Sequence, residues 1–229
     1  MITLPASQDA VALVDWLEAS LLTHNADRIS DTAIIDVLSE ADIEDPDGLL
    51  AGVNHTLRAR SRAIGTHYPF RRDGLGFART LSWKECLPYS FMLFTSLNQS
   101  YRELNFVGGS ANKPAELFET LASKAIEKYL DCTVIRIGAP RRKPVPSQFP
   151  KALEYTVKEL GEIIGTRDLE RHNSGDDGVD LIGWRTFGDT RASQAIILAQ
   201  CAIGTDWRDK RDGVSLEMWR RHIDWHSAL

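Results

Sequence analysis

The sequence predicts an α/β protein whose N-terminal region is helical and whose C-terminal part alternates helices with strands. In the first hundred residues, apolar side chains recur at three- to four-residue spacing, as on the buried face of a helix. After residue 112, short β-branched runs such as 132–138 (CTVIRIG) follow helical segments. Glycine, asparagine and proline cluster at 108–114 between the two patterns. We therefore expect two domains, residues 1–112 and residues 113–229, with a small mixed sheet flanked by helices in the second.

Four helices are expected in the N-terminal region. The first has Ser7 as its candidate N-cap, and the third follows Pro46 and ends near Gly65. Basic residues in the last turns of the third helix suit the negative end of its dipole. Residues 68–84 have the composition of a loop. The four helical segments are 7–24, 31–39, 48–63 and 87–103.

The C-terminal region is expected to contain three helices and three strands. The helices are expected at 115–130, 153–164 and 216–225. The strands are expected at 132–138, 179–187 and 195–202. A loop rich in proline and basic residues at 139–150 and a polar loop at 167–177 connect them.

Composition excludes several classes of protein. With 229 residues and 43% hydrophobic residues, the chain can bury a core without disulfides. The three cysteines lie far apart and form no CxxC or Cys/His pattern, which argues against structural zinc and favours reduced thiols in the cytoplasm. Acids interrupt the apolar positions of residues 1–20, so neither a signal peptide nor a membrane span is expected there.

Charge is distributed unevenly along the chain. Residues 1–57 carry eleven acidic residues and one arginine, whereas residues 58–112 carry eight basic residues and three acids. Residues 113–229 carry eighteen of each sign. A nucleic acid is therefore expected to be attracted to the middle segment, and we expect the acidic first 57 residues to cover or compete for it. The alternative is that these charges form ordinary solvated helix faces.

Three short stretches carry the strongest functional signal. They are LFETL at 117–121 on a helix, GDDGVDLIGW at 175–184 entering a strand, and IILAQCA at 196–202 on the next strand. A helix acid followed by an acid at a strand entry and a polar residue on the adjacent strand resembles the PD-(D/E)xK nuclease superfamily, in particular its Mrr-type restriction endonucleases. The resemblance covers about half of the chain, roughly residues 113–229, and implies a restriction-endonuclease-like fold there.

The resemblance implies a metal-dependent endonuclease that cuts phosphodiester bonds in DNA. Such hydrolysis needs an activated water and charge compensation at the phosphoryl oxygens, which Mg²⁺ or Mn²⁺ can supply. Because Mg²⁺ prefers oxygen ligands, Asp180 and Gln200 are the implied metal ligands, and Glu119 binds or orients a second metal or the water. The implied context is a bacterial restriction or phage-defence system with an ATPase or sensor partner.

One departure puts catalysis in doubt. The lysine of the family should follow Gln200 by two residues, where this sequence has Ala202. Lys210 is the first candidate for a relocated lysine and Arg208 is the second, since a turn containing Gly204 precedes both. The alternative to an endonuclease is a catalytically silent nuclease-fold subunit that binds nucleic acid or scaffolds a defence complex.

Other polar residues have competing interpretations. Arg141, Arg142 and Lys143 are the candidate phosphate contacts of the C-terminal region, against a solvated loop. Asp176 and Asp177 are typical turn formers, and His172 is either a base or a surface histidine. Three further residues have interpretations without catalysis: Cys201 is expected to be a small buried apolar residue, and His222 and His226 complete no metal spacing.

Overall fold

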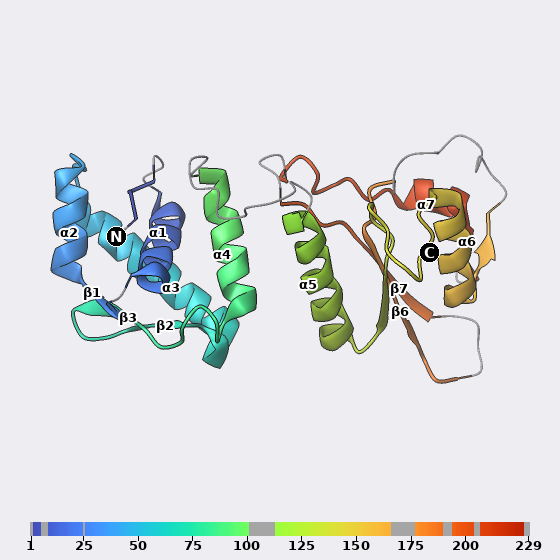
Figure 1. Cartoon of the computed structure of the whole chain (residues 1–229), viewed down its shortest axis with the longest axis horizontal. Coiled ribbons are helices and arrows are strands. Elements are labelled where there is room, and N and C mark those ends of the chain that lie inside the picture. The colour runs from blue at the N-terminus through green and yellow to red at the C-terminus, as the bar shows by residue number, and fades with distance from the viewer. Residues whose placement is uncertain are drawn as a thin grey trace. The chain divides into compact units, whose positions relative to one another are not determined.

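The computed structural model of the chain describes residues 2–5, 9–24, 26–100, 113–165, 177–189, 194–203 and 207–226. The chain divides into two compact units, Met1–Gly108 and Gly109–Leu229. The boundary expected from the sequence lay after residue 112. Both units combine helices with small antiparallel sheets (Figure 1), which confirms a mixed α/β composition.

The described part of the N-terminal unit packs helices against a three-stranded antiparallel sheet of order β1-β3-β2. Its elements are α1 (Ala10–Thr23), β1 (Arg28–Ser30), α2 (Asp31–Glu40), α3 (Pro46–Ile64), a single 3₁₀ turn η1 (Gly65–His67), β2 (Phe70–Arg72), β3 (Gly76–Arg79) and α4 (Leu87–Ser100).

Local capping explains where these helices begin. The side chain of Asp9 accepts from the amide of Ala12, which makes Asp9 the N-cap of α1. The expected cap, Ser7, lies outside the described residues. Asp45 caps α3 in the same way, and Pro46 occupies the first turn, where its missing N–H has no cost. Helix α3 therefore begins two residues before the expected start.

The expectation of a loop at 68–84 is wrong, because this segment contains the hairpin β2–β3. Asp73 and Gly74 form its turn: the amide of Asp73 donates to the carbonyl of Gly76 at 2.9 Å, and Gly74 has a φ of 58°. An Asp-Gly pair favours such turns, because its glycine adopts positive φ without strain. The strands were missed because each has only three or four residues, too few for a visible alternation.

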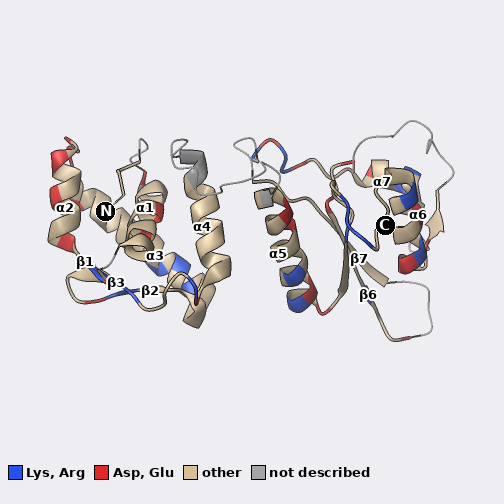
Figure 2. Ribbon diagram, in the orientation of Figure 1, with Lys and Arg blue, Asp and Glu red and all other residues tan. Residues whose placement is uncertain are grey.

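The acidic first 57 residues are part of the N-terminal core and do not form a separate cover. Leu13, Val14 and Trp16 of α1 are all at most 2% exposed. Acids from this segment form ion pairs with arginines of the basic segment, and Figure 2 shows acids on α1 and α2 and basic residues on α3 and β2. Deleting residues 1–57 would remove the core, so that deletion cannot test competition for DNA.

The described part of the C-terminal unit has a three-stranded sheet of order β4-β6-β7 and a two-stranded sheet β5-β8. In Figure 1, α5 lies on one side of the larger sheet and α6 and α7 lie on the other. Its elements are α5 (Lys113–Leu130), β4 (Thr133–Arg136), α6 (Phe149–Leu160), β5 (Ile163–Ile164), β6 (Leu181–Thr186), β7 (Gln194–Ala199), α7 (Leu216–His222) and β8 (Ile223–Asp224).

The sheet is antiparallel and not mixed, as far as the described strands show. Strand β6 pairs antiparallel with β4 and with β7. The chain leaves β4 at Arg136, forms α6 and β5, and returns at Leu181, which is the register partner of Arg136. The connection from β4 to β6 therefore begins and ends at the same end of the strands. A parallel neighbour would need a connection that crosses to the opposite end.

Helix α6 also differs from its expected bounds of 153–164. It begins at Phe149 with Pro150 in its first turn, and Gly161 ends it with a φ of 71°. Residues after this glycine form β5 and pair with β8. No helix in the described ranges is long and apolar enough to cross a membrane.

Candidate active site

The end of β4, the start of β6 and the end of β7 lie side by side at one end of the β4-β6-β7 sheet. Arg136 at the end of β4 pairs with Leu181 at the start of β6, and Leu181 pairs with Ala199 at the end of β7. Gly138 follows β4, Asp180 directly precedes β6, and Cys201 follows β7. The antiparallel register therefore brings together residues that are more than 60 positions apart in the sequence.

Glu119 reaches this edge from α5, which packs on β4 and β6. Its side chain is buried and forms an ion pair with Arg136, whose Nε donates to Glu119 Oε2. A buried carboxylate needs such a partner, because desolvation penalises an isolated charge. Glu119 is therefore a buried, ion-paired carboxylate and not a solvated helix residue.

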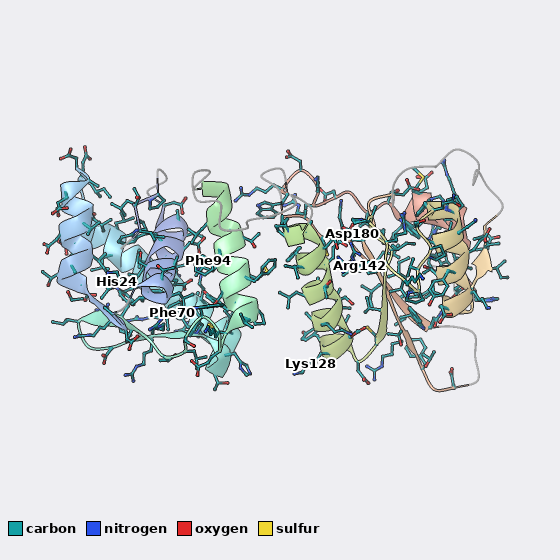
Figure 3. The ribbon with its side chains drawn as sticks, viewed as in Figure 1. His24, Phe70, Phe94, Lys128, Arg142 and Asp180 are labelled. Atoms are coloured by element: carbon teal, nitrogen blue, oxygen red, sulfur yellow. The ribbon has the colours of Figure 1, made fainter. Side chains whose placement is uncertain are left out.

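Asp180 carries the second carboxylate of the site. Its Oδ2 accepts from the amide of Cys201 at 2.6 Å, and its own amide donates to the carbonyl of Ala199 at 2.9 Å. These bonds fix Asp180 between the start of β6 and the end of β7, and Figure 3 labels Asp180 in the C-terminal unit.

The two carboxylates converge over Gly138. A Cβ atom built on Gly138 would lie 2.7 Å from Asp180 Oδ1 and 3.1 Å from Glu119 Oε2. Glycine at this position therefore leaves room between the two carboxylates that any other side chain would fill.

Arg136 is the residue that sequence reasoning missed. Its Nη1 donates to the carbonyl of Pro140 at 2.9 Å, and its Nη2 is buried without a hydrogen-bond partner among the described residues. The available signal was an arginine inside the strand-like run CTVIRIG, where a charge needs a partner. Strand alternation placed Arg136 and Val134 on one face, but the sequence could not show that Glu119 lies above that face.

Gln200 has a different environment from the two carboxylates. Its side chain packs against Gly213, and its Oε1 is buried without a hydrogen-bond partner in the described part of the chain. The expectation that Gln200 and Asp180 share one metal ion stays a prediction. The group in direct contact with Asp180 is the backbone amide of Cys201, the residue after Gln200.

Lys210 and its neighbours lie on an exposed turn at 207–212. The amide of Gly213 donates to the carbonyl of Lys210 at 3.0 Å and closes this turn. Arg208 stacks on Trp207, with its guanidinium carbon 4.8 Å from the ring centroid. Ala202, at the position of the family lysine, is half-buried. The relocation of the lysine to residue 210 stays a prediction.

The candidate phosphate contacts lie beside Arg136. A cavity of about 280 Å³ is lined by Arg136, Arg142 and Lys143 together with Thr120 of α5. Arg142 forms an ion pair with Glu116 of α5, one turn before Glu119. Arg141 is oriented differently: it donates to the carbonyl of Ser147 at 3.0 Å and lies over the ring of Phe149. The basic loop therefore adjoins the carboxylate site through Arg142 and Lys143.

The surroundings of Cys201 disfavour its thiolate form. Burial, together with the negative charges of Asp180 and Glu119, raises the pKa of its thiol to about 12. The thiol therefore stays protonated, and the thiolate is the reactive form.

Asp177 is a turn residue with a long-range partner. Its φ is 46°, in the left-handed region that aspartate tolerates. Its Oδ2 lies 2.5 Å from His222 Nε2, and its carbonyl accepts from Trp219 Nε1 at 3.3 Å. This contact joins the entry to β6 with α7 and has a structural role. His172 and Asp176 lie outside the described residues.

The carboxylate pair fits a Mg²⁺ ion that keeps several waters. Mg²⁺ binds through one or two protein carboxylates and retains much of its hydration shell. Asp180 Oδ1 and Glu119 Oε2 both lie within 3.1 Å of the point that a Cβ atom on Gly138 would occupy, and Glu119 Oε2 also accepts from Arg136 Nε. Across the ranges that the structure covers, no group of three or more His, Cys, Asp or Glu side chains is arranged around a metal position. The site therefore fits an ion held by two carboxylates and water, with Arg136 beside them.

Gly138→Ala is expected to lower the affinity for Mn²⁺ at least about tenfold, because the new methyl group would occupy the space between the carboxylates. Gly183→Ala is the matched control, since a Cβ on Gly183 makes only ordinary contacts of 3.4 Å or more. Mn²⁺ binding followed by electron paramagnetic resonance checks this. Equal affinities of the two variants would show that no metal lies at Gly138.

Comparison with family models, with curated proteins and with solved structures finds no match to this chain.

Proposed function

We propose that the C-terminal unit is a restriction-endonuclease-like domain that hydrolyses phosphodiester bonds in DNA with Mg²⁺. The observation that carries the proposal is the convergence of Glu119 and Asp180 over Gly138, with Arg136 paired to Glu119. The order of Glu119 on a helix, Asp180 at a strand entry and Gln200 after the next strand is the order that resembles the PD-(D/E)xK nucleases. By that resemblance, the proposed setting is bacterial restriction or phage defence, beside an ATPase or sensor partner.

Different residues of the chain would bind the metal, position a carboxylate and contact the phosphates. Asp180 and Glu119 would hold the metal ion, which when bound supplies an activated water and neutralises phosphoryl oxygens. Arg136 holds Glu119 in place, and its buried Nη2 is a donor for a phosphoryl oxygen on which charge develops. Arg142 and Lys143 line the adjoining cavity and can contact phosphates on either side of the scissile bond.

A cleavage assay tests this proposal. End-labelled duplex DNA, single-stranded DNA and RNA are incubated with the full chain in Mg²⁺, in Mn²⁺ and in EDTA. We expect cutting of DNA that requires the metal and stops in EDTA. Binding to DNA without cutting in either metal would replace the proposal with the second candidate.

The second candidate is a nuclease-fold subunit that binds nucleic acid without cutting it, or that scaffolds a defence complex. Two observations favour it: Ala202 replaces the lysine of the family, and the ion pair with Arg136 already neutralises Glu119. A gel-shift assay separates its two forms, because a binding subunit retards DNA and a scaffold does not.

We expect Arg136→Gln to lower metal-dependent cleavage by about a hundredfold or more, because Arg136 is the cation in contact with the carboxylate site. Lys210→Ala is expected to lower it much less, since Lys210 is exposed on the 207–212 turn. Circular dichroism of both variants checks the fold. If Lys210→Ala abolishes cutting and Arg136→Gln does not, Lys210 is the relocated lysine.

A further inference from the structure

A second candidate binding site lies in the N-terminal unit, in a cavity of about 260 Å³ between α3 and the β2–β3 hairpin. Its floor contains the buried aromatic residues Tyr68, Phe70 and Phe77. Tyr68 and Phe70 meet edge to face with ring centroids 5.5 Å apart. Figure 3 labels Phe70 in this unit. The floor of the cavity is therefore apolar.

Four arginines surround this floor, and no acidic side chain lines the cavity in the described part of the unit. Arg58 and Arg62 are four residues apart on α3, so they lie on one face of the helix. Arg71 and Arg72 lie on β2, which is an edge strand of the sheet. All four are exposed.

The ion pairs of the unit leave three of these arginines available. Arg72 donates to both carboxylate oxygens of Asp31 and lies over the ring of Phe77. By contrast, Arg58, Arg62 and Arg71 form no ion pair or hydrogen bond within the residues that the structure describes. Solvated arginines alone explain the exposure of these three side chains. They do not explain why four arginines and no described acidic residue line one cavity, since like charges repel.

This combination selects a ligand with both a planar apolar part and an anionic part. Guanidinium groups bind phosphate through paired hydrogen bonds, and they do so better than ammonium groups. A nucleobase presents a flat π face that can lie on an apolar floor or on a guanidinium plane. The cavity is slightly smaller than the roughly 300 to 1,000 Å³ of ordinary small-molecule sites, so it suits one nucleotide and not a dinucleotide cofactor.

We propose that this cavity binds a nucleotide, with the base on the apolar lining of the cavity and the phosphate on Arg58 and Arg62. The nucleotide is either a free mononucleotide or one unpaired unit of a nucleic acid strand, since both present the same chemistry. The site belongs to the N-terminal unit and does not depend on the cleavage proposed for the C-terminal unit.

Calorimetric titration of the full chain tests the proposal. The ligands are purine and pyrimidine mononucleotides, a short single-stranded oligonucleotide, duplex DNA, inorganic phosphate and polyglutamate. We expect a mononucleotide or the single strand to bind at least about tenfold more tightly than inorganic phosphate. Binding of mononucleotides identifies a free nucleotide as the ligand, whereas binding of the oligonucleotide alone identifies a strand.

The double variant Arg58→Ser/Arg62→Ser is expected to weaken this binding at least about tenfold. The charge-matched control is Lys151→Ser/Lys158→Ser, which removes two exposed cations from α6 and should leave binding unchanged. Four outcomes would overturn the proposal: no nucleotide or strand binding, equal loss in both double variants, phosphate binding as tight as nucleotide binding, or binding of polyglutamate alone.

Discussion

Asp180→Asn is expected to lower Mg²⁺-dependent cleavage of labelled duplex DNA at least about a hundredfold, because a neutral amide cannot replace a carboxylate that holds a metal ion. Asparagine keeps an oxygen that can accept from the amide of Cys201, so the junction between β6 and β7 should persist. The initial rate of product formation, measured under single-turnover conditions, gives the effect.

Asp131→Asn is the matched control for this experiment. Asp131 has a φ of 49° before β4, a conformation that asparagine adopts as readily, and its side chain is exposed. The substitution Asp131→Asn removes one negative charge from the same unit. Asp131 precedes β4, at the end of the strand opposite to Arg136. A similar loss of cleavage in both variants would show that net charge, and not a metal ligand, controls the rate.

Glu18→Gln is expected to destabilise the N-terminal unit by about 3 to 5 kcal/mol, the range for removing one partner of a buried ion pair. Glu18 is fully buried on α1 and accepts hydrogen bonds from Arg60 at 2.7 Å, Tyr89 at 2.6 Å and Tyr68. Burial raises the pKa of Glu18, and the hydrogen bonds and the charge of Arg60 offset part of this rise. A glutamine side chain has one oxygen and cannot accept all three bonds.

Hydrogen exchange of the α1 amides during a urea titration measures this loss and assigns it to the N-terminal unit. Glu40→Gln is the control, because Glu40 is exposed at the last position of α2 and should change stability by less than about 0.5 kcal/mol. Equal stabilities of the two variants would show that the network of Glu18, Arg60 and the tyrosines does not hold α1 in place.

The long helices could be predicted from the sequence because their apolar residues repeat over many turns. Helix α5 differs from its expected span only by its first two residues, and α2 by its last residue. The strands of the N-terminal unit were missed because β1, β2 and β3 are too short to show alternation. Their pairing depends on contacts between Arg28 and Ala78, which are fifty positions apart.

The sequence pointed to the two acids of the candidate site, Glu119 and Asp180, but not to its cation, Arg136. Asp180 interrupts an apolar strand entry, whereas Glu119 was singled out only by the resemblance of three stretches to a nuclease superfamily. Arg136 became a member of the site only through the register of β4 with β6, which no local pattern specifies. For the same reason, local pattern could not predict the contact between Asp177 and His222, which are 45 positions apart.

The central claim is that Glu119 and Asp180 together hold one divalent cation over Gly138. Anomalous diffraction from a crystal of the full chain soaked in Mn²⁺ tests it most directly. We expect an anomalous peak within coordination distance, about 2.0 to 2.3 Å, of both Asp180 Oδ1 and a Glu119 carboxylate oxygen. A saturated crystal with no peak at this position, or with its strongest peak at Gln200 and Gly213 or at Asp177 and His222, would contradict it.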